Sequence, residues 1–208
     1  MSDPAINSMS TVKRALAEIR SLKSQLKAAH DGQHEPIAIV GLGLRFPGGC
    51  NDPDSYWQLL SEGRCAISEI PSSRWKIDDY YDPDPARPGK MYARHGGFLE
   101  SVDELDPDLF GVSPREATTM DPQHRLLLEV SWEAIENAGY NASRLAGTSA
   151  AVYFGLSNSD YSRLVFRDAQ RLDAYASTGN LFCVAAGRLS HLLGIEGPSL
   201  VVDTACSS

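Results

Sequence analysis

Three short apolar runs, separated from one another by longer helical segments, constrain the fold of this chain more than any other feature. The runs cover residues 35–41, 150–155 and 199–203, and helices are predicted over residues 53–63, 122–139 and 178–193. Apolar runs of this length are typical of buried strands, and their alternation with helices is typical of a parallel sheet. The sequence therefore predicts an α/β fold with a largely parallel sheet.

The predicted helices begin at recognisable capping residues. Asp52, Ser113 and Asp121 each precede a proline. Asp and Ser are common N-cap residues, and proline is common at the first position of the helix that follows. Residues 113–116 also have the form of a capping box, in which Ser and Glu side chains bond each other's backbone. Gly194 follows the last predicted helix and is expected to end it.

The first thirty residues differ in charge and pattern from the rest of the chain. Apolar residues recur there at alternating steps of three and four, the a/d heptad pattern of a coiled coil. The segment has a net charge of +3, so the remaining residues carry −11 of the total of −8. The apolar positions are Val12, Ala15, Ile19, Leu22, Leu26 and Ala29, and the basic residues are Lys13, Arg14, Arg20, Lys23 and Lys27.

A helix this short is marginally stable alone, so it is expected to pair with a copy of itself or with another helix. We therefore interpret residues 1–34 as a basic docking or dimerisation helix, with a linker at residues 31–34. The alternative is an N-terminal helix that has no role.

Charge and hydropathy disfavour two classes of partner. A net charge of −8 disfavours a nucleic-acid-binding protein, which needs a basic face. The longest apolar stretch, residues 37–44, is far shorter than the ~20 residues that cross a bilayer. The first ten residues lack the basic and apolar regions of a secretory signal. We expect a soluble, cytoplasmic protein with no nucleic-acid or membrane partner.

Two local patterns imitate binding motifs but lack essential parts. Gly41 and Gly43 resemble the start of a dinucleotide-binding loop, yet Phe46 occupies the position of the third glycine. Residues 78–90 contain four aspartates, but their three prolines and the lack of EF-hand spacing predict a solvated loop. The four cysteines form no C-x-x-C pair. We expect no directly bound cofactor and no metal ion.

Cys206 is the candidate nucleophile. The apolar run 199–203 delivers it to a turn of small residues, where a helix would begin. The positive end of a helix dipole and its free N–H groups would stabilise a thiolate and the oxyanion of an acyl intermediate. The alternative is a buried structural thiol, an interpretation that suits Cys50, Cys65 and Cys183 better.

Seven segments carry a resemblance to a known family. Residues 203–208 (DTACSS) resemble the active-site signature of β-ketoacyl synthases, and residues 120–125 (MDPQHR) resemble a segment of modular type I polyketide ketosynthases. The other similar segments are 35–41 (EPIAIVG), 46–49 (FPGG), 94–99 (RHGGFL), 110–116 (FGVSPRE) and 186–190 (AGRLS). The resemblance covers residues 35–208, and the basic helix before it is similar to the docking coiled coils that precede such ketosynthases.

The resemblance implies a thiolase-like fold, of which residues 35–208 would supply the N-terminal half. It implies that Cys206 accepts an acyl chain from the phosphopantetheine arm of an acyl carrier protein. Decarboxylative condensation with a malonyl-type extender on a carrier protein would follow. The implied partners are acyl carrier protein, a second copy of the chain in a homodimer, and an upstream synthase subunit that binds the N-terminal helix.

The resemblance implies that the second half-reaction uses two histidines from the C-terminal half, one of them within a His-Gly-Thr-Gly-Thr motif. Neither that motif nor its partner histidine occurs here. His95 and His124 lie in family-like segments, but we expect structural or surface roles for them. We therefore expect a truncated domain that does not condense substrates alone. Two alternatives stay open: a non-catalytic docking module with an incomplete body, and a condensing domain of a fatty-acid synthase. The acyl substrate, the extender and the product do not follow from the sequence.

Overall fold

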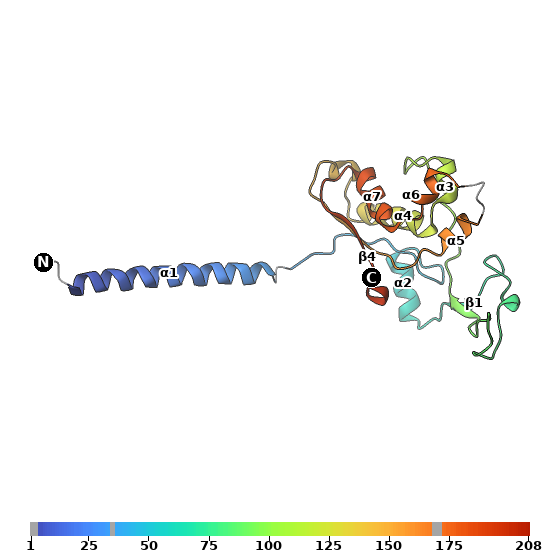
Figure 1. Cartoon of the computed structure of the whole chain (residues 1–208), viewed down its shortest axis with the longest axis horizontal. Coiled ribbons are helices and arrows are strands. Elements are labelled where there is room, and N and C mark those ends of the chain that lie inside the picture. The colour runs from blue at the N-terminus through green and yellow to red at the C-terminus, as the bar shows by residue number, and fades with distance from the viewer. Residues whose placement is uncertain (1–3, 34–35, 168–171) are drawn as a thin grey trace. The chain divides into compact units, whose positions relative to one another are not determined.

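A computed structural model of the chain describes residues 4–33, 36–167 and 172–208, and in the first helix it describes the side chains of residues 13–27. The chain divides into two compact units, Met1–Ile39 and Val40–Ser208. Figure 1 shows both units and labels helices α1 to α7 together with strands β1 and β4. The sequence predicts a domain boundary between residues 34 and 35, close to this division. The functions expected for the two parts stay predictions.

The first unit contains one long helix, α1 (Pro4–Gln33), which confirms the helix that the heptad pattern predicts. The predicted linker is wrong for residues 31–33, which continue the helix, because a single glycine costs a helix only about 1 kcal/mol. Ile19, Leu22 and Leu26 are 48%, 57% and 73% exposed, and Leu16 is a further exposed apolar residue that the heptad analysis missed. The side chains of Val12 and Ala29 lie outside the described residues.

Two small sheets organise the second unit. Strands β3 (Val152–Gly155) and β4 (Ser199–Val202) are parallel, which confirms two of the predicted strands and their direction. Strands β1 (Ile67–Glu69) and β2 (His95–Gly97) are antiparallel and were not predicted, since their sequences have few apolar residues and two adjacent glycines. The helices of this unit are α2 (Pro53–Ser61), α3 (Pro114–Thr119), α4 (Pro122–Asn137), α5 (Tyr161–Val165), α6 (Ala174–Thr178) and α7 (Phe182–Leu193); the 3₁₀ helices include η1 (Ile77–Asp79), η2 (Ala142–Leu145) and η4 (Ala205–Ser207).

The predicted buried strand at residues 35–41 is wrong. Residues 36–41 form no strand, and Ile37 and Ile39 are 94% and 80% exposed. A strand needs a neighbour for its backbone N–H and C=O groups, and no described strand pairs with this run. Gly41 and Gly43 instead lie against α4, where an added Cβ would approach backbone oxygens of α4 to 2.1 Å and 2.0 Å. Close packing, rather than a phosphate loop, accounts for these glycines.

The capping residues act largely as predicted. Asp52 and Ser55 form a reciprocal capping box on α2, and the Asp121 side chain accepts from the backbone N–H of Gln123 at the start of α4. Ser113 accepts from the backbone N–H of Glu116 at 3.2 Å. The second half of that predicted capping box is wrong, because the Glu116 side chain forms an ion pair with Arg188 on α7 instead.

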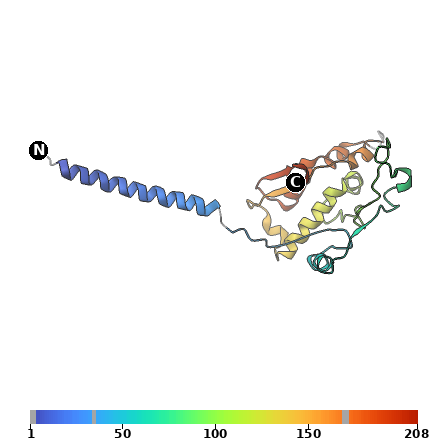
Figure 2. The same cartoon turned by 90° about the horizontal axis from the view of Figure 1, so that it is seen from below.

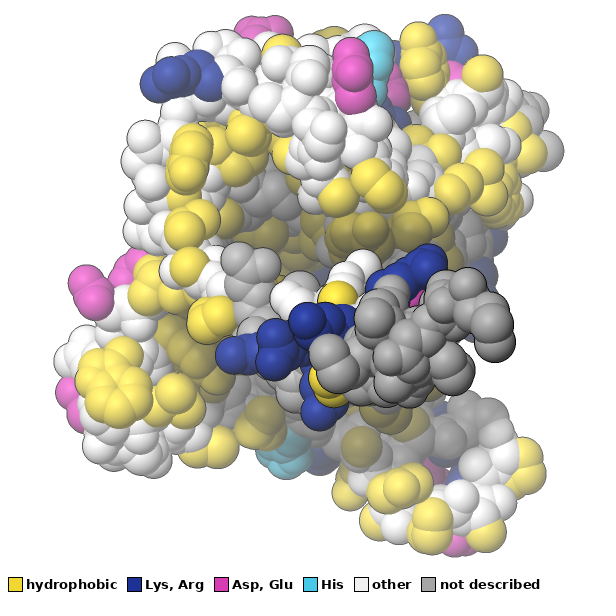
Figure 3. All heavy atoms as spheres, turned by 90° about the vertical axis from the view of Figure 1, so that its left-hand side faces the viewer, with side chains coloured by type: hydrophobic (Ala, Val, Ile, Leu, Met, Phe, Trp, Pro, Cys, Tyr) yellow, Lys and Arg dark blue, Asp and Glu magenta, His cyan; other side chains and the backbone are white. Residues whose placement is uncertain are grey.

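The core of the second unit lies between the parallel sheet and its helices. Helix α7 packs against β3 and β4 (Figure 1 and Figure 2) and ends at Gly194, whose φ of 63° is left-handed. Alternate residues of the two strands face the core, while Tyr153, Leu200 and Val202 are exposed. Hydrophobic side chains also reach the surface at several places on the face that Figure 3 shows. The core residues are Phe110, Val112, Met120, Leu128, Ala142, Val152, Ala186, Leu189, Leu193 and Ile195.

None of the helices in the described part of the chain has both the length and the apolar composition that a membrane span requires.

Candidate active site

Cys206 lies in a tight turn directly after β4. The Asp203 side chain accepts from the backbone N–H of Ala205 at 3.0 Å, and the Ser208 hydroxyl accepts from the backbone N–H of Thr204 at 2.7 Å. Ala205 has a φ of 55°, and it is the non-glycine residue with a left-handed backbone among those described. Such a conformation costs about 1–3 kcal/mol and persists where the surrounding structure holds it. The turn therefore fixes the residue immediately before the thiol.

Cys206 lies at the centre of the three-residue 3₁₀ helix η4. One 3₁₀ turn has too few aligned peptide groups for the dipole of an α-helix. The dipole argument concerns an α-helix that is not expected within these 208 residues, so it stays a prediction. What the structure retains is the delivery of an exposed thiol to the carboxyl end of a parallel strand.

The other cysteines differ from the expectation in one respect. Cys50 is buried and its thiol donates to the backbone oxygen of Ser55 at 3.5 Å, as expected of a structural thiol. Cys65 and Cys183 are exposed, so their predicted burial is wrong. Exposure alone therefore does not distinguish Cys206. Its left-handed neighbour and its position after β4 do.

Gly155 supports the Cys206 turn from the neighbouring strand. A Cβ on Gly155 would lie 2.2 Å from the backbone C atom of Ser208, so only glycine fits at this position. The next residue, Leu156, donates its N–H to the Val202 oxygen at 3.2 Å. The segments that follow β3 and β4 thus leave the same edge of the sheet. In parallel sheets this carboxyl edge is where ligands bind.

The segment 120–125 begins α4 with a buried polar cluster. Asp121, His124 and Arg125 are all buried. Arg125 donates to the Met120 oxygen at 2.7 Å and to the Asp103 oxygen at 2.6 Å, so its charge is held by backbone carbonyls. Burial raises the pKa of Asp121, while hydrogen bonds from Gln123 oppose that increase. The sequence indicated Asp121 as the start of a helix, and it indicated the segment as a whole by its family resemblance.

Of the two roles expected for His124, the structural one fits its burial and the surface one does not. Its side chain is buried, and burial together with the nearby Arg188 charge lowers its pKa to about 4. His95 and His191 are exposed, while His30 and His34 lie outside the described side chains. A neutral, buried imidazole of this kind is suited to packing rather than to proton transfer at neutral pH.

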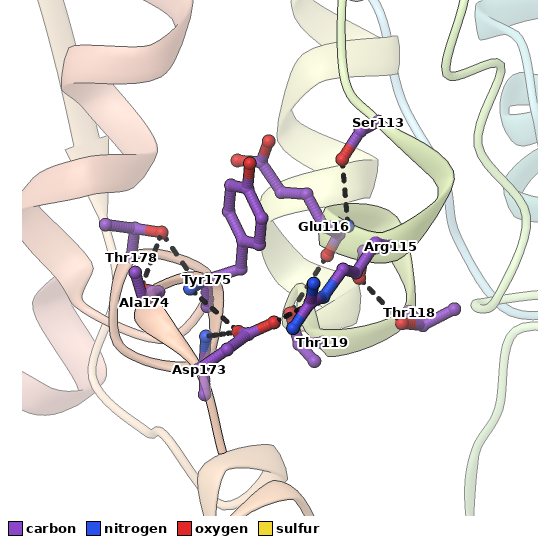
Figure 4. A network of polar contacts seen from close by, with 10 residues as sticks. Ser113, Arg115, Glu116, Thr118, Thr119, Asp173, Ala174, Tyr175 and Thr178 are labelled. Atoms are coloured by element: carbon purple, nitrogen blue, oxygen red, sulfur yellow. Dashed lines mark hydrogen bonds and ion pairs between the residues drawn. The ribbon is translucent and has the colours of Figure 1, made fainter. Parts of the chain in front are cut away.

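A polar network joins α3 to the later helices (Figure 4). Arg115 donates to Asp173 at 2.8 Å, and Asp173 also caps α6 through the backbone N–H groups of Tyr175 and Ala176. Asn180 donates to the oxygens of Thr119 and Ala176. The sequence analysis missed this network, because its partners lie about sixty residues apart and form no local pattern.

Comparison with known proteins shows the family of this chain. Residues 34–208 match the family model described as "Beta-ketoacyl synthase, N-terminal domain". The chain belongs to the β-ketoacyl synthases. The fold is accordingly thiolase-like, and the chain covers the N-terminal half of a ketosynthase domain, as the sequence resemblance implied.

Polyketide synthases are among the related sequences. The ketosynthase chain is 51% identical over 174 residues, 84% of its length, to a phenolphthiocerol/phthiocerol polyketide synthase of Mycobacterium tuberculosis. It is 46% identical over 198 residues, 95% of its length, to the pikromycin polyketide synthase component PikAII of Streptomyces venezuelae. The chain spans only 10% and 5% of these two proteins.

A solved ketosynthase has the same fold. The oxazolomycin ketosynthase domain OzmH KS7 of Streptomyces albus JA3453 superposes with a TM-score of 0.75 at 38% identity. The match covers 82% of this ketosynthase chain and 30% of the solved one. At this identity the likeness extends to sequence as well as to fold, and it agrees with the family match.

Proposed function

We propose that this chain is the acyl-accepting half of a polyketide ketosynthase, with Cys206 as its nucleophile. The observation that carries the proposal is the delivery of an exposed thiol by β4 to a turn whose preceding residue, Ala205, is held in a left-handed conformation. A nucleophile on such a turn projects from the carboxyl edge of the sheet, where a thioester can approach it.

The first step is a thioester exchange. The Cys206 thiolate attacks the acyl carbonyl on the phosphopantetheine arm of an acyl carrier protein. A bond forms between the carbonyl carbon and Sγ, the original C–S bond breaks, and the carrier thiol takes up the proton that Cys206 lost. The backbone N–H groups of the turn are candidates to hold the oxyanion.

The second step is a condensation. Loss of CO₂ from a malonyl-type thioester gives a carbanion, which attacks the acyl–Cys206 carbonyl and releases the β-ketoacyl product and the Cys206 thiolate. The names of the relatives support polyketide over fatty-acid synthesis as the setting. The docking-only alternative has less support, because residues 203–208 (DTACSS) resemble the active-site signature of the family.

The test uses a complete ketosynthase domain that carries residues 34–208 of this chain as its N-terminal half. Incubation with acyl and malonyl carrier proteins is expected to yield one CO₂ for each β-ketoacyl product, and Cys206→Ala is expected to abolish both. Condensation that persists in Cys206→Ala would exclude the proposed nucleophile. Cys183→Ala is the matched control, since Cys183 is also exposed.

For helix α1 we propose a docking or dimerisation role over residues 1–34. Its apolar seam is exposed along the described side chains, and Lys13, Arg20 and Lys27 repeat at intervals of seven residues beside that seam. Apolar seams of this kind are buried against another helix, and a basic flank favours an acidic partner. The proposed partners are a second copy of the chain and the acidic tail of an upstream synthase subunit.

A further inference from the structure

One side chain of α4 joins the start of that helix to the loop that follows β3. Gln123 Nε2 donates to the backbone oxygen of Asn158 at 2.7 Å and to the Asp121 side chain at 3.3 Å. Both hydrogens of the amide are therefore used. Asp121 is buried and accepts from the Gln123 backbone as well, so the donor is held in place from its own helix.

The loop of residues 156–160 that Gln123 contacts is short and bound at both ends. Its first residue, Leu156, is buried and donates to the Val202 oxygen at 3.2 Å. Ser159, near its other end, donates its hydroxyl to the Asn180 oxygen at 3.3 Å. Between these two points, the side chain of Gln123 ties the loop to α4 by its hydrogen bond to Asn158.

This loop is continuous with the residue that supports the Cys206 turn. Gly155 precedes Leu156 and lies against the backbone of Ser208, with no room for a Cβ between them. A shift of the loop therefore moves Gly155, and a shift of Gly155 moves the turn, because closely packed backbones do not yield independently. Gln123 is thus connected to the turn by its hydrogen bond to Asn158, by the three residues of chain back to Gly155, and by the close approach of Gly155 to Ser208.

We propose that Gln123 is a positioning residue for the Cys206 turn, acting through the loop of residues 156–160. The proposal rests on the function proposed for Cys206 and adds a residue that does not touch the thiol. Its amide donates to a carbonyl and a carboxylate at once, so the interaction needs a donor and not merely a side chain of this size.

Three substitutions separate the donor from the shape of the side chain. Gln123→Met keeps the length and removes the donor. Gln123→Lys restores a donor that can bond both oxygens. The matched control is Gln58→Met, because Gln58 donates to Glu62 at 2.8 Å on the exposed surface of α2, away from the turn.

Amide hydrogen exchange on the full 208-residue chain measures the coupling between the loop of residues 156–160 and the Cys206 turn directly. Gln123→Met is expected to speed exchange about threefold or more in both residues 156–160 and residues 203–208, while Gln58→Met changes neither. Gln123→Lys is expected to return both segments to within about twofold of the wild type. Faster exchange in the loop alone, with the turn unchanged, would overturn the proposal.

Acylation of Cys206 in the complete ketosynthase domain gives the functional consequence. Gln123→Met is expected to lower the maximal rate of acylation about tenfold with little change in KM, and alkylation of Cys206 by iodoacetamide is expected to stay within about twofold. Equal losses in acylation and alkylation would indicate general loosening and contradict a positioning role. If the wild type is not acylated, the function of Cys206 is wrong, and the exchange measurement still decides the coupling.

Discussion

Arg188 on α7 and Glu116 on α3 form an ion pair at 2.6 Å in which each side chain is only 15% exposed. The pair ties the helix that leads into β4 to the segment that leads into α4. Removal of one partner leaves the other as an uncompensated charge with little access to water.

We therefore expect Glu116→Ala to lower the free energy of unfolding by about 3 kcal/mol or more. Arg115→Ala on the same helix is the control, because Arg115 is 74% exposed in its pair with Asp173 and such pairs contribute about 0–1 kcal/mol. Urea unfolding followed by circular dichroism measures both variants. Equal losses of unfolding free energy from the two substitutions would show that burial does not make the Glu116 pair more important for stability than the exposed Arg115 pair.

His124 is expected to make the stability of the second unit depend on pH. At pH 7 the imidazole is neutral in the folded chain and mostly neutral in the unfolded chain, whose imidazole has a pKa of 6.5. As the pH falls through 6.5 the unfolded chain binds a proton, whereas the folded chain does so only near pH 4. The free energy of unfolding should therefore fall by about 3 kcal/mol between pH 7 and pH 4.

His124→Gln is expected to remove this part of the pH dependence, whatever its effect on stability at pH 7. The exposed His191→Gln on α7 serves as the control and should retain the wild-type slope. Unfolding curves at half-unit steps of pH provide the measurement. A slope between pH 6.5 and pH 4 that is the same in His124→Gln and in the wild type would contradict the assignment.

Substitution by alanine is expected to change the stability in opposite directions at Gly155 and at Gly187. Gly155→Ala brings a Cβ to 2.2 Å from the Ser208 backbone, so strand β3 or the Cys206 turn has to shift, at a cost of about 1–3 kcal/mol. Gly187 lies within α7 and has open space around its Cβ position, so Gly187→Ala should stabilise by about 0.5–1 kcal/mol. Thermal unfolding of the two variants tests the sign of each change. A stabilising Gly155→Ala would show that the close approach to Ser208 is not required.

For α1, we expect the apolar seam to matter more than any single charge. Leu22→Asp places a carboxylate in the apolar contact and should abolish association, whereas Lys23→Glu should mainly change which partner is accepted. Sedimentation of residues 1–39, with and without acidic helical peptides, measures both effects. A helix that stays monomeric at high concentration and binds no acidic peptide would leave α1 without the proposed role.

The parts of the fold that sequence predicts correctly are those with a local cause. Helix starts at Asp52 and Asp121 depend on a side chain two or three residues from the backbone group it bonds, so the signal lies within a few positions. Parallel pairing of β3 and β4 follows from their apolar runs. The expected strand at residues 35–41 has the same local signal but no neighbouring strand, and pairing is not a local property.

The candidate site likewise combines a local sequence signal with contacts between distant residues. Cys206 is predicted as the nucleophile from six consecutive residues, but the contacts that support its turn come from distant ones. Gly155 packs against Ser208 across fifty-three positions, and Gln123 reaches Asn158 across thirty-five. At Glu116 a contact with a distant residue replaces a local one. Its side chain forms a buried ion pair with Arg188 instead of the local capping bond that its sequence position favours.

The central claim is that Cys206 accepts the acyl chain, and mass mapping of the acylated residue tests it most directly. A complete ketosynthase domain containing residues 34–208 is incubated with an acyl carrier protein thioester, digested and analysed for peptides that carry the acyl mass. The account predicts the adduct on Cys206, its loss in Cys206→Ala and its retention in Cys183→Ala and Cys65→Ala. An adduct on Cys65 or Cys183, or one that survives Cys206→Ala, would contradict it.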